Sequence, residues 1–236
     1  MEIKGFVDLS LVDWPGKLSS VFFVADCNFR CPFCYNSTLV LHPDKVETIA
    51  FERIEDYLKK QRAWIDGVCV TGGEPMLHKD LPDLCSKLKR MGLLVKVDTN
   101  GTNPMMMKEL MDRRLVDYIA VDIKAPLTVE KYSKSAGVKA EKPLERVKET
   151  IGILLGSKVN YEFRTTVVPT LHEEDDIKKI CDDIKGCTKY VLQKFSISLG
   201  KTTIDPDFSK LKPFTDEKMK KFLTIAQEYL PNTELR

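Results

Sequence analysis

The sequence has almost no net charge and few histidines. Its 37 lysines and arginines nearly balance 35 aspartates and glutamates, which leaves a formal net charge of +2. Proteins that bind nucleic acids or anionic membrane surfaces are usually much more basic, so we expect neither partner. The three histidines, His42, His78 and His172, lie in polar contexts, and we expect them at the surface rather than in a catalytic role.

Long apolar segments are also missing. No run approaches the roughly 18 residues that a membrane-spanning helix needs, and residues 1–5 have neither the apolar core nor the cleavage site of a secretory signal. Seven cysteines are an odd number, which does not favour a disulfide framework without such a signal. We therefore expect a cytoplasmic protein whose thiols are reduced.

Three of the cysteines lie within the loop Cys-Asn-Phe-Arg-Cys-Pro-Phe-Cys-Tyr-Asn at residues 27–36. Cys27, Cys31 and Cys34 are close enough along the chain to bind one soft metal centre, and a centre with three protein ligands keeps one position open for a substrate. A zinc site, for which the nearest fourth ligand outside the loop is His42, and a disulfide are the alternatives, and both fit the pattern less well.

Apolar strand-like runs alternate with amphipathic helical segments along the rest of the chain. We predict strands at 3–16 (a short strand and turn), 20–25, 67–71, 93–98, 118–123, 160–168 and 190–195, and helices at 51–65, 81–91, 105–114, 144–155, 173–185 and 216–229, with a polar loop at 128–142. Such alternation is typical of right-handed crossovers and a parallel sheet.

Six strand-helix units are too few for a closed eight-stranded barrel. We therefore predict an α/β fold with an open-sided parallel sheet, a partial (βα)6 barrel. With 236 residues and no linker, the chain is expected to form a single domain, with an N-terminal strand and turn at 1–17, the core at 18–200 and a C-terminal helical segment at 201–236. The cysteine loop follows the strand at 20–25, at the end where such sheets place their sites.

Other polar residues also follow predicted strands. The motifs are Gly-Gly-Glu-Pro at 72–75, Asp-Thr-Asn-Gly at 98–101, Asp-Ile-Lys at 122–124, and Arg164 inside a strand-like run. Each has an ordinary reading alone: the first two are good turns, the third is an ion pair, and a strand arginine can face solvent. Their order after the cysteine loop makes them informative together.

The cysteine loop followed by Gly-Gly-Glu resembles the radical S-adenosylmethionine (radical SAM) enzymes. The Asp-Thr-Asn-Gly and Asp-x-Lys segments, with Ser-Leu-Val-Asp-Trp-Pro-Gly at 10–16, resemble its glycyl-radical-enzyme activating branch. That branch includes the activating proteins of anaerobic ribonucleoside-triphosphate reductase and of pyruvate formate-lyase. The similarity extends from residue 5 to about residue 195, with two departures: Tyr35 stands where the commonest activase loop has histidine, and the strand at 190–195 lacks the histidine that some relatives carry there.

The resemblance implies a [4Fe–4S] cluster on Cys27, Cys31 and Cys34, and S-adenosylmethionine (SAM) as cofactor. By the same resemblance Gly73 and Glu74 hold the SAM ammonium group, and Asp98 and Asp122 flank its carboxylate, in some members through a monovalent cation. The SAM-binding residues expected in this chain are Phe33, Tyr35, Asn36, Gly73, Glu74, Asp98, Thr99, Asp122, Lys124 and Arg164.

The resemblance also implies a reaction and partners. Flavodoxin or ferredoxin reduces the cluster, SAM is split to methionine and a 5′-deoxyadenosyl radical, and that radical takes a hydrogen atom from one glycine of a partner enzyme. The expected partner is anaerobic ribonucleoside-triphosphate reductase. One alternative is a radical SAM enzyme acting on a small molecule, such as 7-carboxy-7-deazaguanine synthase. A more distant one is a non-catalytic zinc-binding module.

Overall fold

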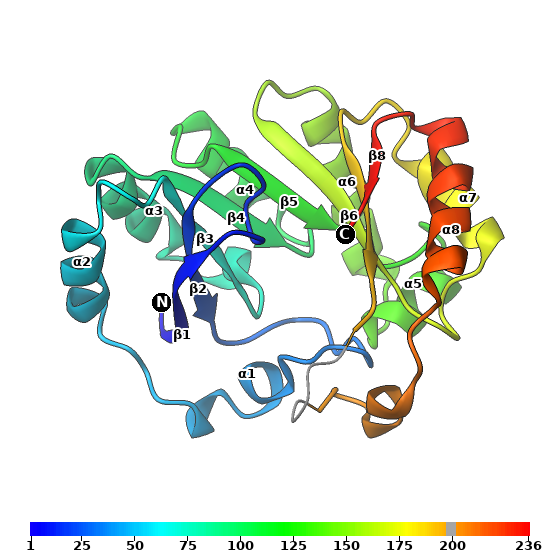
Figure 1. Ribbon diagram of the computed structural model, residues 1–236, viewed down its shortest axis with the longest axis horizontal. Coiled ribbons are helices and arrows are strands. Elements are labelled where there is room, and N and C mark those ends of the chain that lie inside the picture. The colour runs from blue at the N-terminus through cyan, green and yellow to red at the C-terminus, as the bar shows by residue number, and fades with distance from the viewer. Residues whose placement is uncertain (197–201) are drawn as a thin grey trace. The chain divides into compact units, whose positions relative to one another are not determined.

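The computed structural model describes residues 1–196 and 202–236, which form an α/β fold (Figure 1). The strands are β1 (Ile3–Ser10), β2 (Ser19–Val24), β3 (Gly67–Gly72), β4 (Leu94–Thr99), β5 (Tyr118–Asp122), β6 (Asn160–Val167), β7 (Tyr190–Lys194) and β8 (Thr233–Leu235). The helices are α1 (Ser37–Leu41), α2 (Phe51–Lys60), α3 (Leu81–Arg90), α4 (Pro104–Asp112), α5 (Val129–Ala136), α6 (Glu141–Leu155), α7 (Glu174–Asp183) and α8 (Asp216–Tyr229). None of the helices in the described residues has the length and apolarity of a membrane span. The boundary predicted at residues 200 and 201 lies outside the described residues.

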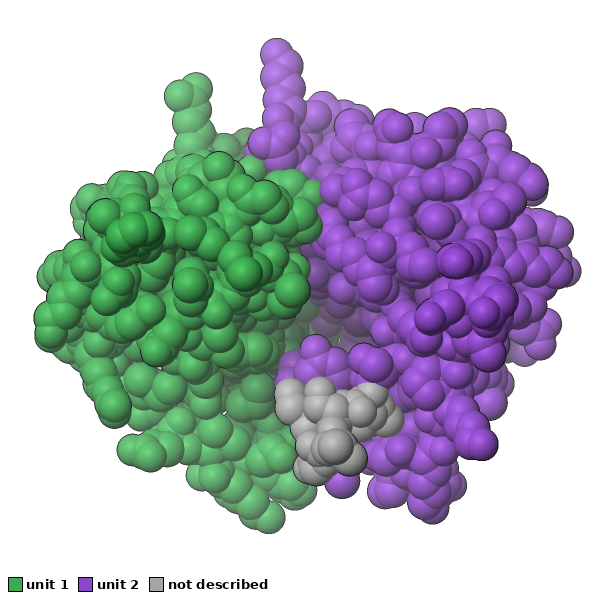
Figure 2. All heavy atoms as spheres, viewed as in Figure 1, with its two compact units in different colours: residues 1–28, 38–99, 105–119 green, residues 29–37, 100–104, 120–236 purple. Residues whose placement is uncertain are grey.

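The chain divides into two compact units (Figure 2). The first contains residues 1–28, 38–99 and 105–119, and the second contains residues 29–37, 100–104 and 120–236. Both the cysteine loop and β5 pass from the first unit into the second. Cys27 therefore belongs to the first unit, whereas Cys31 and Cys34 belong to the second.

The strands follow one another in sequence order, from β1 to β8, and do not close into a ring. In the first unit β1 is antiparallel to β2, while β2 is parallel to β3 and β3 to β4, with Val21 opposite Cys69 and Cys69 opposite Lys96. In the second unit β6, β7 and β8 are parallel, and α7 packs beside α8 (Figure 1). The predicted open, largely parallel sheet is confirmed.

The core follows from the apolar runs of the sequence. Val21, Phe22 and Val24 of β2 are fully buried, as expected for a strand covered on both faces. On α2 the buried residues are Ile54 and Leu58, which lie one turn apart on a single face. The apolar periodicity therefore identified these elements correctly, although α2 ends at Lys60 rather than at residue 65.

The prediction of a polar loop at 128–142 was wrong. This segment contains α5, which ends at Gly137 in the left-handed conformation with φ of 67°. A helix that ends on a left-handed glycine is a common arrangement, because glycine has no Cβ to clash there. Tyr132 and Ala136 are spaced as neighbours on one helix face, and both are fully buried. That apolar pair and the glycine were the signals that indicate a helix here.

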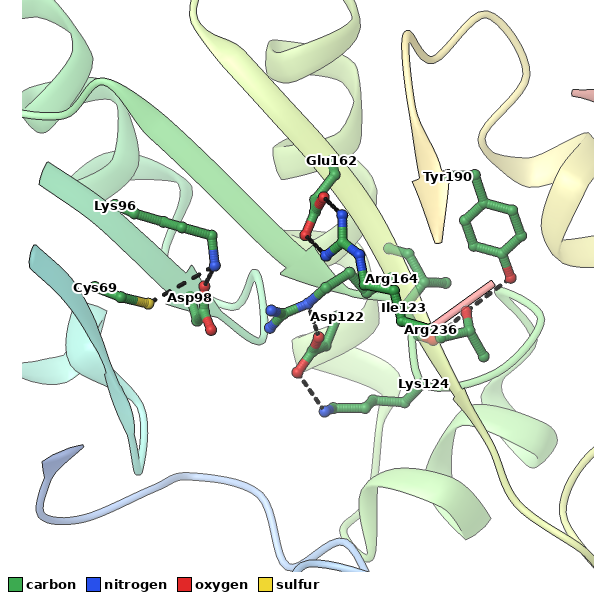
Figure 3. Close-up of polar contacts among 11 residues, drawn as sticks. Cys69, Lys96, Asp98, Asp122, Ile123, Lys124, Glu162, Arg164, Tyr190 and Arg236 are labelled. Atoms are coloured by element: carbon green, nitrogen blue, oxygen red, sulfur yellow. Dashed lines mark hydrogen bonds and ion pairs between the residues drawn. The ribbon is translucent and has the colours of Figure 1, made fainter. Parts of the chain in front are cut away.

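A buried ion pair fastens the end of the described chain in the second unit. The Glu162 side chain on β6 is fully buried, and Arg236 donates hydrogen bonds of 2.9 and 2.7 Å to its two carboxylate oxygens (Figure 3). The Arg236 backbone N–H also donates to the Leu192 carbonyl at 2.9 Å. Arg236 therefore holds the end of β8 against β6 and β7.

Replacing Arg236 by alanine is expected to destabilise the protein strongly, because it leaves a buried carboxylate without its guanidinium. Breaking a buried pair in this way costs about 3 kcal/mol or more. Arg113→Ala is the matched control, since its pair with Glu109 is half exposed and such pairs contribute at most about 0.5 kcal/mol. Denaturant unfolding measures both variants. Equal losses would show that the Glu162 pair does not fasten this part of the chain.

Candidate functional site

The cysteine loop begins directly after β2. Cys31 is buried, while Cys27 and Cys34 are partly exposed. Burial raises the pKa of the Cys34 thiol, and the Asn36 backbone and Lys124 act in the opposite direction. Among the described residues, no three His, Cys, Asp or Glu side chains converge as they would around a single metal ion. A cubane cluster binds each cysteine through a different iron atom. Whether the loop fits such a cluster therefore depends on its soft thiol donors and on how its backbone is held in place.

The Gly72-Gly73-Glu74 turn supports the start of this loop within the first unit. The Gly73 and Glu74 backbone N–H groups donate to the carbonyls of Val24 and Asp26 at 2.9 and 2.7 Å. A Cβ on Gly73 would lie 1.9 Å from the Asp26 carbonyl oxygen, so no other residue fits there. The turn is therefore packed against the residue that immediately precedes Cys27.

Glu74 is buried and its carboxylate is held in a defined orientation. Its Oε1 accepts hydrogen bonds from the Met76 backbone N–H at 3.0 Å and from the Thr99 hydroxyl at 2.6 Å. Thr99 is the last residue of β4 and is itself buried. The structure therefore brings together two of the predicted SAM-binding residues, one from each strand end.

Asp98 has a basic partner on its own strand. Lys96 is completely buried and makes an ion pair with the Asp98 carboxylate, and its Nζ lies 3.7 Å from the Cys69 sulfur (Figure 3). The two residues are separated by one position, which places them on the same face of β4. Lys96 was not singled out from the sequence, although a lysine inside an otherwise apolar strand was a usable signal.

A second ionic group lies in the second unit, at the end of β5 and within β6. Asp122 accepts hydrogen bonds from Lys124 Nζ at 3.0 Å and from Arg164 Nε at 2.9 Å (Figure 3). Burial alone raises the Asp122 pKa, but Arg164 and Lys124 outweigh it and hold the pKa at about 2. The carboxylate is therefore ionised at neutral pH. Two positive side chains and one negative one leave the group with one net positive charge, which suits an anionic group of a ligand.

Lys124 is positioned by two further residues of the second unit. Its ammonium lies 5.9 Å from the centre of the Phe33 ring, which is in the cysteine loop. Its carbonyl is hydrogen-bonded to His172 Nε2 at 2.9 Å, and His172 Nδ1 accepts the Val168 backbone N–H at 3.0 Å. The prediction that His172 lies at the surface was wrong, because only 2% of it is exposed. Nothing in the sequence near Val168 and His172 indicated that the His172 side chain would bond to the Lys124 carbonyl.

The end of α5 contacts the cysteine loop in the second unit. The Arg30 backbone N–H donates to the Ala136 carbonyl at 2.9 Å, and a Cβ on Gly137 would lie 1.9 Å from the Arg30 carbonyl oxygen. Phe29 packs edge-on against Tyr132, with the ring centroids 6.3 Å apart. This contact fixes the backbone immediately before Cys31.

The residues present fit an iron–sulfur cluster and SAM. Three soft thiols follow one strand, the backbone before Cys27 and before Cys31 is fixed by glycine contacts, and the proton of a buried Tyr132 hydroxyl beside the loop has no acceptor among the described residues. Glu74 offers an oriented carboxylate to an ammonium group. Tyr35 is 48% exposed and Asn36 is partly exposed, so neither is buried in its unit.

Comparison with known proteins agrees with these features. Residues 21–184 match the model of the radical SAM superfamily. A Methanocaldococcus jannaschii protein, whose name proposes a glycyl-radical enzyme activating enzyme, is 33% identical over 99% of this chain and 95% of its own length. The 7-carboxy-7-deazaguanine synthase of Halobacterium salinarum is 37% identical, but over only 37% of this chain and 35% of its own.

The fold also matches solved structures. SuiB from Streptococcus suis, in its structure bound to S-adenosylmethionine, aligns with a TM-score of 0.66 and 14% identity. The alignment covers 92% of this chain and 51% of SuiB, so the chain spans about half the length of that protein. The likeness concerns the fold, whereas the family follows from the sequence match over residues 21–184. The chain belongs to the radical SAM superfamily.

Proposed function

We propose that this radical SAM enzyme activates a glycyl radical enzyme by removing a hydrogen atom from one backbone glycine. The observation that carries the proposal is the 33% identity over nearly the whole length of both chains to the M. jannaschii protein named for that activity. The strand-end motifs add support, because they supply groups of the right charge for the two ends of an amino acid.

In this proposal Cys27, Cys31 and Cys34 hold one [4Fe–4S] cluster, and the Gly73 turn fixes the backbone before Cys27. Glu74 accepts hydrogen bonds from the SAM ammonium. The positive group of Lys124, Arg164 and Asp122 faces the SAM carboxylate. Thr99 orients Glu74, and Phe33, Tyr35 and Asn36 contribute the loop side of the SAM site. When bound, the cluster and SAM would supply a one-electron reduction that releases methionine and a 5′-deoxyadenosyl radical.

Finer features stay predictions. Anaerobic ribonucleoside-triphosphate reductase is the expected partner, and flavodoxin or ferredoxin is the expected electron donor. A monovalent cation near Asp98 and Asp122 is also only a prediction, since both carboxylates already pair with basic side chains.

Anaerobic reconstitution tests the proposal. The wild-type chain should take up about four irons, and after reduction it should convert SAM to methionine and 5′-deoxyadenosine. A protein that is loaded with iron but does not cleave SAM, with or without partner enzymes, would contradict the proposed reaction.

Replacing Glu74 by glutamine is expected to weaken SAM binding while the cluster still assembles. A hydrogen bond to a charged group contributes about 1.5–3 kcal/mol, so binding should weaken by about tenfold or more. Glutamine still has an oxygen that can accept from Thr99 and Met76, which keeps the turn intact. Glu47→Gln, at an exposed position of the same unit, is the matched control. SAM titration of iron-loaded protein measures both, and equal affinities would remove Glu74 from the SAM site.

The small-molecule alternative has one specific observation in its favour, the 37% identity over 93 residues to 7-carboxy-7-deazaguanine synthase. The match covers little more than a third of either chain, whereas the activase match covers almost all of both. If SAM cleavage requires a small purine-like substrate and is indifferent to protein partners, the alternative holds.

A further inference from the structure

Tyr132 places a buried polar group beside the cysteine loop. The whole residue is fully buried, and the proton of its hydroxyl finds no acceptor among the described residues. Burying a hydroxyl without a partner costs stability, so such groups are uncommon unless a ligand or water completes them. Tyr190, a fully buried tyrosine of the same unit, behaves in the usual way and donates to the Thr165 hydroxyl at 2.8 Å.

The surroundings of Tyr132 connect it to Cys31. Its ring packs edge-on against Phe29, two residues before Cys31. At the end of the same helix, a Cβ on Gly137 would lie 3.2 Å from the Cys31 backbone nitrogen. Burial raises the Tyr132 pKa, the Lys124 charge and a hydrogen bond from the Lys124 backbone to the phenol oxygen oppose that shift, and Cys31 and Asp122 raise it further. The hydroxyl is therefore protonated at neutral pH and lies within the electrostatic reach of Cys31.

We propose that the Tyr132 hydroxyl donates a hydrogen bond to a sulfur atom of the iron–sulfur cluster at Cys31. This inference rests on the proposed function, because it requires the cluster. The sulfur supplies the acceptor that the hydroxyl lacks among the described residues. Hydrogen bonds to cluster sulfurs are one of the factors that set the reduction potential of such centres. Reduction adds negative charge, so the donor stabilises the reduced cluster more than the oxidised one and raises the potential.

Potentiometry of Tyr132→Phe tests the proposal. The substitution keeps the ring that packs on Phe29 and removes only the hydroxyl, so full iron content is expected. At a fixed solution potential the ratio of reduced to oxidised cluster should fall by about tenfold, which corresponds to a midpoint about 59 mV lower for a one-electron couple. The reduced cluster is followed by electron paramagnetic resonance during the titration.

Tyr190→Phe is the matched control, since it removes the same group from an equally buried tyrosine of the same unit. It should leave the midpoint unchanged and lower the melting temperature of the cluster-free protein, because the Thr165 contact is lost. Tyr132→Phe should lower the cluster-free melting temperature less than Tyr190→Phe does, because the Tyr132 hydroxyl donates to no described residue.

Two results would overturn the inference. One is a fully iron-loaded Tyr132→Phe protein with the wild-type midpoint. The other is a cluster-free Tyr132→Phe protein as destabilised as Tyr190→Phe, because the hydroxyl proton would then already have an acceptor within the protein. A wild-type chain that takes up no four-iron cluster would overturn the proposed function together with this inference. That failure appears in the wild-type chain, so it is distinguishable from a failure of this inference alone.

Discussion

Replacing Cys27, Cys31 or Cys34 by alanine is expected to abolish SAM cleavage and to prevent a stable four-iron cluster from forming. Each substitution removes one of the three proposed thiolate ligands, and a cluster that already keeps one iron open would have no spare protein donor to replace it. The three cysteines are the only thiols within the loop of residues 27–36. Iron and sulfide analysis after anaerobic reconstitution, followed by an assay for 5′-deoxyadenosine, measures the loss.

Cys187→Ala is the matched control for these variants. Cys187 is partly exposed, like Cys27 and Cys34, and burial raises its pKa to about 11, so it is a poor metal ligand in the folded protein. It should keep the full iron content and activity. Iron loss from Cys187→Ala equal to that from the loop variants would contradict the assignment of the cluster to the three loop cysteines.

Replacing Gly137 by alanine is expected to displace the backbone of the cysteine loop, although Gly137 is far from that loop in the sequence. The new Cβ would lie 1.9 Å from the Arg30 carbonyl oxygen and 2.5 Å from the carbonyl carbon. The backbone of Arg30, immediately before Cys31, therefore has to shift. The left-handed φ of 67° adds about 1–2 kcal/mol of strain for a residue with a Cβ. We expect a lower free energy of unfolding and a reconstituted iron content well below that of the wild type.

Gly186→Ala separates the collision from the strain. Gly186 lies in the same unit with a φ of 90°, and nothing lies within 4 Å of an added Cβ. This variant should lose about 1–2 kcal/mol of stability from the backbone conformation alone and keep its iron. If Gly137→Ala and Gly186→Ala retain equal iron, the contact between α5 and the loop does not support the cluster.

Local sequence patterns were sufficient for the features that depend on neighbours along the chain. The apolar run at 20–25 predicted β2, which is buried as expected. The order of the strand-end motifs indicated the family, and the match over residues 21–184 confirms it. The individual site residues stay predictions until variants are measured.

The features that were missed depend on contacts between distant residues. The polar composition of 128–142 hid α5, whose buried Tyr132 packs edge-on against Phe29 of the cysteine loop. His172 bonds to the carbonyl of Lys124, which is 48 positions away in the sequence. No single-sequence pattern specifies such a pair, since the spacing is set by the packing of whole elements.

The central claim is that the radical formed from SAM acts on a protein glycine, and one labelling experiment tests it most directly. Reduced, iron-loaded protein is incubated with SAM deuterated at C5′ and a candidate glycyl radical enzyme, beginning with anaerobic ribonucleoside-triphosphate reductase. The proposal predicts that hydrogen exchanges between one glycine Cα of the partner and 5′-deoxyadenosine, together with a glycyl radical signal in electron paramagnetic resonance. Label that appears only in a small metabolite, with no glycyl radical on any candidate partner, would contradict the claim.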